Sequence, residues 1–196
     1  MTREAKRRRT TKETQIDLSI DVDGSGQVEV STGLPFFDHM IAQLGKHSRF
    51  DLTVRCEGDI DIDAHHTVED VGIALGEAFA EALGDKQGVR RFASMTVPLD
   101  EAAVEVILDL SGRPFLHYDI EPPGEKILGD PPFDPQLCEE FWRAFVMAAG
   151  ITLHLVLLRG RNTHHIIEAS FKATARALYD AVVVADEVLP STKGVL

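Results

Sequence analysis

Hydrophobic and polar positions follow two periodicities along the chain. Apolar and polar residues alternate at 14–22 and 27–32, which predicts two strands joined as a β-hairpin through the turn residues 23–26. Helical spacing then begins at Pro35 and runs to about His47. The rest of this half predicts strands at 50–56 and 59–63, and a long helix from about His65 to Leu83 that ends near Gly84.

The same order of elements returns after Gly88. Each half reads as strands, a helix, a strand and a long helix, so we expect an internally duplicated α+β fold. Two units, residues 1–88 and 89–196, would each carry helices on one face of a sheet and pack together. The second half predicts strands at about 92–98, 102–110, 114–120 and 151–158, helices at about 136–149 and 164–183, a loop at 122–135 and an irregular tail at 190–196.

The motif His-His-x-x-Glu opens the long helix of each half, at 65–69 and at 164–168. In each copy the first histidine and the glutamate stand four residues apart, so they share one helix face and can bind the same metal ion. The second histidine projects about 100° away around the helix, toward a different ion or ligand. The duplicated motif therefore predicts two related metal sites. The candidate ligands are His65, His66, Glu69, His164, His165 and Glu168.

The net charge of the chain limits the classes of molecule that we expect it to bind. A net charge of −12 argues against general nucleic-acid binding and suits a protein that collects divalent cations. The basic run 6–9 fits a solvated arm or an edge strand. No apolar run approaches the roughly 18 residues that span a bilayer, and the N-terminus lacks the apolar region of a signal peptide. We therefore expect a cytoplasmic protein without membrane contact.

Five motifs occur in order along the chain: FFDHM at 36–40, DAHHTVED at 63–70, DLSGRP at 109–114, HHIIEA at 164–169 and PSTKG at 190–194. Together they resemble the imidazoleglycerol-phosphate dehydratase family of histidine biosynthesis. The resemblance implies a ribosomal-S5-domain-2-like fold in which both halves form one catalytic domain. It also implies a manganese lyase with two Mn²⁺ ions per subunit and a large homo-oligomer of roughly 24 subunits.

The resemblance also assigns roles to individual residues. It places catalysis on Glu13 and His47. Many relatives carry a histidine where the helix at 136–149 has Glu140, and a glutamate there can also bind Mn²⁺. The implied metal ligands are His39, His65, His66, Glu69, Glu140, His164, His165 and Glu168. The implied substrate contacts are Glu13, His39, His47, Arg91, Arg113, Lys172, Ser191, Thr192 and Lys193.

The family reaction removes water from a glycerol phosphate chain attached to an imidazole. The proton that leaves is not alpha to a carbonyl, so the workable route uses the ring: metal ions on its nitrogens favour the imidazolate, which expels the neighbouring hydroxyl. A carboxylate or histidine then takes the C–H proton, and the enol product becomes a ketone. Mixed His and carboxylate ligation suits Mn²⁺, although such sites also accept Fe²⁺, Co²⁺ or Zn²⁺.

Two other functions fit the same motifs. A dinuclear metallohydrolase would use its paired metals to activate water and would release phosphate. A non-enzymatic metal-binding assembly would take up metal without any dependence on Arg91, Arg113 or Lys193.

Overall fold

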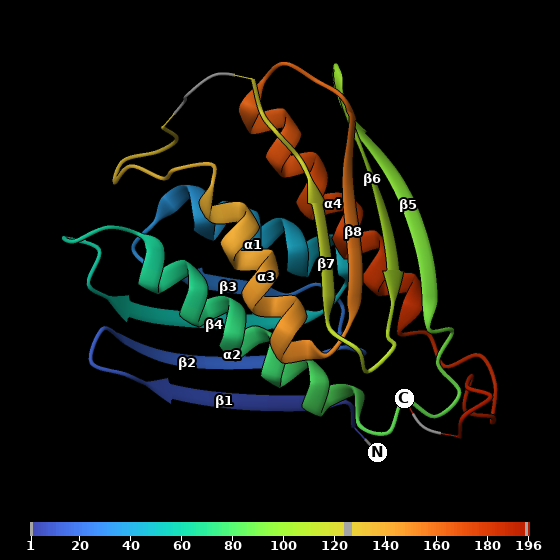
Figure 1. Cartoon of the computed structure of the whole chain (residues 1–196). Coiled ribbons are helices and arrows are strands. Elements are labelled where there is room, and N and C mark those ends of the chain that lie inside the picture. The colour runs from blue at the N-terminus through green and yellow to red at the C-terminus, as the bar shows by residue number, and fades with distance from the viewer. Residues whose placement is uncertain (1, 124–126, 195) are drawn as a thin grey trace.

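The computed structural model describes residues 2–123, 127–194 and 196, and within them eight strands and four helices form two sheets with helices between them (Figure 1). The first half contains β1 (Glu4–Thr10), β2 (Thr14–Asp21), β3 (Val28–Ser31), α1 (Pro35–Ser48), β4 (Asp51–Gly58) and α2 (His65–Leu83). The second half contains β5 (Phe92–Leu99), β6 (Ala102–Asp109), β7 (Phe115–Asp119), α3 (Leu137–Ala149), β8 (Thr152–Arg159) and α4 (Thr163–Ala181).

Both sheets have the same topology, which confirms the duplicated α+β fold. The strand order is β1-β2-β4-β3 in the first sheet and β5-β6-β8-β7 in the second. Neighbouring strands are antiparallel except at one edge of each sheet, where β3 pairs with β4 and β7 pairs with β8 in parallel. The basic run 6–9 lies in the edge strand β1, as expected, where Arg7 and Arg9 form ion pairs with acidic residues of α2.

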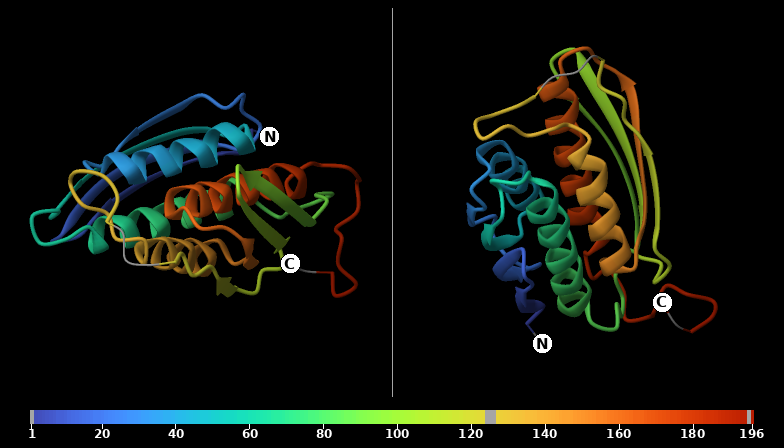
Figure 2. Two further views of the ribbon diagram at one scale, coloured as in Figure 1. Left: turned by 90° about the horizontal axis from the view of Figure 1, so that it is seen from above. Right: turned by 60° about the vertical axis from the view of Figure 1, so that its left-hand side comes forward.

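The helices of the two halves pack against each other. Helices α1 and α2 cover one face of the first sheet, α3 and α4 cover one face of the second, α2 runs along α3, and α1 runs along α4 (Figure 2). Aromatic side chains fill this interior, among them the fully buried Phe79, Phe141 and Trp142. The α1–α4 contact matters for function because each of these helices carries candidate ligands.

Two glycines set the close approach of α2 to α3. A Cβ atom on Gly72 would lie 2.9 Å from the carbonyl oxygen of Phe141, and one on Gly76 would lie 2.5 Å from that of Phe145. Any other residue would push the helices apart, so these positions fix the spacing between the halves.

The predicted hairpin of 14–22 with 27–32 is wrong. Strand β2 pairs with β1 and β4, whereas β3 pairs with the far edge of β4 in parallel. The turn between β2 and β3 is anchored elsewhere: the backbone amides of Ser25 and Gln27 both donate to Oδ1 of Asp51, at the start of β4. These bonds carry the chain across β4 instead of back along β2.

The predicted strand at 59–63 is also wrong, because this segment forms turns. Its acidic residues accept local backbone hydrogen bonds: the amide of Ile62 donates to the carbonyl oxygen of Asp59, and that of His65 donates to Oδ1 of Asp63. Such local acceptors compete with strand pairing.

The other predicted elements occur where the periodicity placed them, within one or two residues. The loop at 122–135 includes residues 124–126, and the irregular tail includes residue 195, all of which lie outside the described residues. Among the described helices, none combines the length and the apolar character needed to cross a membrane.

Candidate active site

Three predicted ligands converge where α1 meets α4. Nε2 of His164 lies 2.9 Å from Oε2 of Glu168, and Nε2 of His39 lies 3.3 Å from the same oxygen. One potential ligand atom from each residue falls within 4.8 Å of the other two. Two imidazole nitrogens and a carboxylate around one point form a donor set that fits a divalent transition metal.

Local structure explains why these side chains meet. The side chain of Asn162 accepts hydrogen bonds from the backbone amides of His164 and His165, and so caps α4 immediately before the motif. His164 and Glu168 then lie one turn apart on a single face. Helix α1 packs along α4 and supplies His39 from the opposite side.

The carboxylate of Glu168 is held in its charged form. Burial alone would raise its pKa, but hydrogen bonds from Lys172, His164 and His39 outweigh this effect and bring the pKa to about 2. Nζ of Lys172 lies 2.6 Å from Oε1, the oxygen that faces away from the histidines. An ionised carboxylate is the form that a metal ion requires.

His47 joins this cluster through a hydrogen-bonded relay on α1. Its Nε2 lies 3.1 Å from Oε1 of Gln43, whose amide nitrogen is 3.5 Å from Nδ1 of His39. Burial, followed by the charges of Lys172 and Arg176, lowers the pKa of His47. A neutral imidazole at this position is able to accept a proton.

The second histidines of the two motifs point elsewhere, as predicted. Nδ1 of His66 lies 2.9 Å from Asp59, and Nδ1 of His165 lies 2.7 Å from Glu101. Each carboxylate fixes its ring and leaves Nε2 available as a ligand atom.

These hydrogen bonds also change acidities. The bond to Asp59 raises the pKa of His66, and the bond to His165, followed by the amide of Asn162, lowers the pKa of Glu101 to about 2. Asp59 lies between β4 and α2, whereas Glu101 lies in the turn between β5 and β6, and sequence reasoning identified neither acid. Nothing in the local sequence signals Glu101, which precedes its histidine by 64 residues.

The first copy of the motif does not close in the same way. Over the described residues, the group of His39, His164 and Glu168 is the only one that gathers three potential ligands, so a single chain does not bring His65, His66 and Glu69 together. His65 instead lines a surface groove of about 630 Å³, and Glu140 lines the same groove. The replacement at 140 thus shares a groove with a candidate ligand of the first motif.

Glu13 stands on the tight turn between β1 and β2, and its side chain is half exposed. Its Oε1 lies 3.9 Å from Nε2 of His66. The turn is fixed by Asp70, a buried residue that accepts hydrogen bonds from Thr11, Thr14 and Arg9. Asp70 was not identified from the sequence, although it lies within the matched segment 63–70.

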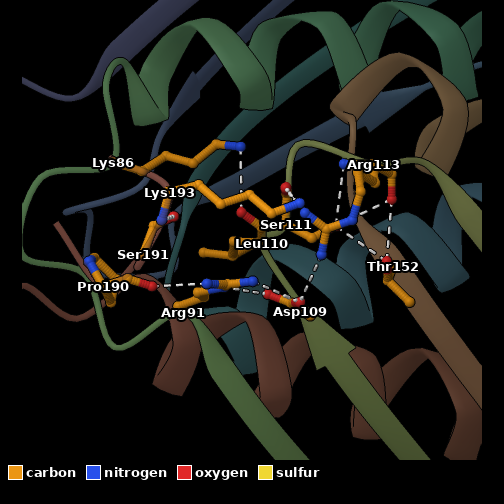
Figure 3. A network of polar contacts seen from close by, with 10 residues as sticks. All are labelled: Lys86, Arg91, Asp109, Leu110, Ser111, Arg113, Thr152, Pro190, Ser191 and Lys193. Carbon is orange, nitrogen blue, oxygen red and sulfur yellow. Dashed lines mark hydrogen bonds and ion pairs between the residues drawn. The ribbon is translucent and has the colours of Figure 1, made fainter. Parts of the chain in front are cut away.

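The predicted phosphate ligands gather around the turn that follows β6, at the other end of the molecule from the acidic turn 59–63 (Figures 1 and 3). Nε of Arg91 donates to Asp109 at 2.7 Å, and its Nη1 donates to the carbonyl of Pro190 at 2.7 Å. Nη1 of Arg113 donates to the carbonyl of Ser111 at 3.1 Å. The bond to Pro190 ties down the segment that carries Ser191, Thr192 and Lys193.

We refer to Arg91, Arg113, Lys193 and the segment 109–111 as the cation corner. One further residue enters it that sequence reasoning missed. Lys86, from the loop after α2, donates to the carbonyl of Leu110 (Figure 3). A lysine in a Gly/Asp-containing loop resembles any solvated lysine in the sequence, so no local signal marks it.

Comparison with known proteins identifies close relatives over the whole chain. The family model described as imidazoleglycerol-phosphate dehydratase matches residues 32–178. The chain is 55% identical over 196 residues to an imidazoleglycerol-phosphate dehydratase of Acidothermus cellulolyticus, which covers 99% of this chain and 93% of that protein. It is 56% identical over 190 residues to that of Acetivibrio thermocellus, with 96% of each chain covered.

Solved structures of the same group superpose on this one. The crystal structure of imidazoleglycerol-phosphate dehydratase from Staphylococcus aureus gives a TM-score of 0.83 at 38% identity, covering 93% of this chain and 99% of that one. The structure from Pyrococcus furiosus gives a TM-score of 0.82 at 35% identity, covering 97% and 100%.

Proposed function

Because the chain belongs to the imidazoleglycerol-phosphate dehydratase family, and is therefore a hydro-lyase of histidine biosynthesis, we propose that it works with two Mn²⁺ ions per subunit. The observation that carries this proposal is the convergence of His39, His164 and Glu168 on one point. A mixed nitrogen and oxygen donor set with an ionised carboxylate suits Mn²⁺.

The second ion would be held by residues of the first motif. His65 and Glu140 line one groove, and the glutamate would replace a nitrogen ligand with an oxygen ligand. Asp59 and Glu101 engage Nδ1 of His66 and of His165, so the Nε2 atoms are suited to complete coordination spheres to which other subunits contribute. This division predicts that the metal sites lie between subunits.

Bound Mn²⁺ would act as a Lewis acid at the imidazole nitrogens of the substrate and favour departure of the adjacent hydroxyl. The residues of the chain do the rest. Glu13 removes the C–H proton from the neighbouring carbon, and this proton and the departing hydroxide together make the water that is released. His47, kept neutral by its surroundings, takes part in the proton transfers that follow as the enol becomes a ketone.

The phosphate would bind in the cation corner, which lies beside the C-terminal end of α4 and would therefore serve the metal site at the N-terminal end of α4 in a neighbouring subunit. Arg91 and Arg113 present guanidinium groups that can form paired hydrogen bonds to phosphate oxygens. Lys193 and the hydroxyls of Ser191 and Thr192 lie on the segment that Arg91 anchors. Lys172 pairs with Glu168, so it would neutralise the charge beside the imidazole end of the substrate.

The decisive experiment incubates the purified protein, depleted of metal and then loaded with Mn²⁺, with imidazole glycerol phosphate. We expect imidazole acetol phosphate, a ketone, and no released phosphate. Phosphate release would instead indicate a hydrolase, and metal uptake without turnover would indicate a binding protein.

Glu13 is tested in the same assay. Glu13→Gln should bind Mn²⁺ and substrate almost normally while kcat falls by roughly 10²–10⁴-fold, because the amide cannot accept the proton. Turnover within a few-fold of the parent would show that another group is the base. Glu29→Gln, at an exposed acid on β3, is the control.

A further inference from the structure

Lys86 is an unusual lysine because its side chain runs inward. The residue is only 8% exposed, and it lies in the loop that joins the two halves after α2. Its backbone is in the left-handed region, with φ of 58°, and its side chain reaches Leu110 of the second half. Figure 3 shows its ammonium directed at the turn after β6, on which the two arginines of the cation corner also converge.

The ammonium is poorly satisfied. Nζ donates to the carbonyl oxygen of Leu110 at 3.3 Å, and within the described chain no carboxylate lies close enough to form an ion pair with it. An ammonium has three donors, and a buried cation that meets one neutral acceptor has lost most of its hydration without compensation. The burial, aided by the charge of Arg91 and opposed by that of Asp109, lowers the pKa of Lys86.

Three cations bind the same short stretch of chain. Arg91 binds Asp109, Lys86 binds Leu110, and Arg113 binds Ser111. The carboxylate of Asp109 is already shared between the two arginines, at 2.7 Å from Nε of Arg91 and 3.8 Å from Nη2 of Arg113. The corner therefore holds more positive charge than its single acid balances.

We propose that Lys86 is a further substrate-binding residue, whose free ammonium donors bind a phosphate oxygen of the substrate in the cation corner. A phosphate dianion supplies both the acceptors and the charge that this lysine lacks. The inference rests on the proposed function, because it takes the phosphate of the substrate as the ligand.

A purely structural role makes a different prediction. If Lys86 served only to tie the loop after α2 to Leu110, its removal would lower stability and leave the affinity for phosphate unchanged. If it is a binding residue, the ligand-free protein carries an incompletely paired buried cation. Lys86→Met, which keeps the length and the apolar stem, should then leave the melting temperature unchanged or raise it.

The experiment compares the parent with Lys86→Met, Lys86→Arg and Lys6→Met, the last at an exposed lysine of β1 as the control. We expect Lys86→Met to raise KM for the substrate and Kd for inorganic phosphate by about 10- to 100-fold, with kcat within a few-fold of the parent. Lys86→Arg should keep most of the phosphate affinity, and Lys6→Met should match the parent. Calorimetric titration with inorganic phosphate gives Kd without any need for turnover.

Several results would overturn the assignment. An unchanged KM and Kd in Lys86→Met would do so, as would a Lys86→Met protein that does not fold, since this would show that the ammonium serves the fold. A loss of affinity in Lys86→Arg as large as that in Lys86→Met would exclude a charge-based role.

The titration also separates this inference from the proposed function. If the parent dehydrates the substrate and Arg113→Ala raises KM while Lys86→Met does not, Lys86 alone has been misassigned. If the parent shows no dehydratase activity but Lys86→Met still weakens phosphate binding, the lysine is an anion ligand and the proposed function is at fault.

Discussion

In each half, one acidic residue holds the ring of the second histidine of the motif. Asp59 and Glu101 contact Nδ1 of His66 and of His165, one in each half. Because Nδ1 is engaged, each ring presents Nε2 in a fixed orientation.

Glu101→Gln should therefore weaken Mn²⁺ binding by about 10- to 100-fold, since an amide holds the ring less firmly and lends it no charge. Titration of metal-free protein with Mn²⁺, followed by calorimetry, measures the change. Glu105→Gln, on the outer face of the second sheet, is the matched control. Equal affinities in the two variants would show that Glu101 does not support the site.

The acidity of Glu168 makes a prediction about stability. Its folded pKa of about 2 lies below the ordinary value of 4.5, so the charged carboxylate stabilises the fold. That contribution is fully present above about pH 4.5 and is lost as the pH falls toward 2. We compare how far the free energy of unfolding falls between these pH values in metal-free protein. The fall should be smaller in Glu168→Gln than in the parent, by on the order of 2 kcal/mol.

Urea unfolding of both proteins at several pH values between 5 and about 2.5 measures the difference. Parallel curves of unfolding free energy against pH would contradict the role of Glu168. Any effect of the substitution that is independent of pH, such as the loss of the Lys172 contact, leaves the slopes unchanged and is subtracted.

Among the elements, the turn between β1 and β2 depends on helix α2. Asp70 accepts hydrogen bonds from Thr11, Thr14 and Arg9. The backbone amide of Glu13 donates a hydrogen bond to Oγ1 of Thr11. The candidate base is thus held by a buried carboxylate that itself need not touch the substrate.

Asp70→Asn should lower kcat by about 10-fold or more, because it frees a turn that must place Glu13 accurately. Steady-state kinetics and Mn²⁺ titration separate this effect from a metal effect, since metal affinity should change little. Asp17→Asn is the control, because Asp17 pairs with the exposed Arg8 on the same two strands. Normal kcat in Asp70→Asn would mean that the turn needs no support.

Considered as a whole, the molecule offers surfaces that suit assembly. The outer face of the second sheet exposes Phe92, Ile107, Phe115 and Leu158, each about half accessible in the isolated chain. Exposed apolar side chains on one face of a sheet suit an interface between subunits. Among the described residues no group of three potential ligands includes His65, His66 or Glu69, so metal binding and assembly should be linked.

We therefore predict that chelator-treated protein sediments as a smaller species and regains a larger one on addition of Mn²⁺. His65→Ala and His164→Ala should weaken that recovery as well as abolish activity, because each removes a ligand from a shared ion. Sedimentation velocity with and without Mn²⁺ is the measurement, with Asp17→Ala, at an exposed position on β2 in the first sheet, for comparison. Full recovery in both ligand variants would mean that these histidines do not bridge subunits.

The periodicity of hydrophobic positions alone predicted most of the helices and strands. The helices at 35–48, 65–83 and 163–181 were predicted to within two residues. Each buries an apolar face; the first begins at a proline, the second ends at a glycine and the third begins after the capping residue Asn162. The divergence of adjacent histidines also followed from helix geometry. Local rules of this kind are readable from the sequence because they act over a few residues.

Contacts between distant residues required the tertiary structure. The pairing of β3 with β4, and not with β2, depends on Asp51, which lies more than twenty residues beyond the turn that it anchors. Glu101 contacts His165, 64 residues further along the second half. Lys86, at the end of the first half, donates to Leu110 in the second. Sequence periodicity reports which face of an element is buried, but it does not report which distant group will meet that face, and the candidate site is built from such meetings.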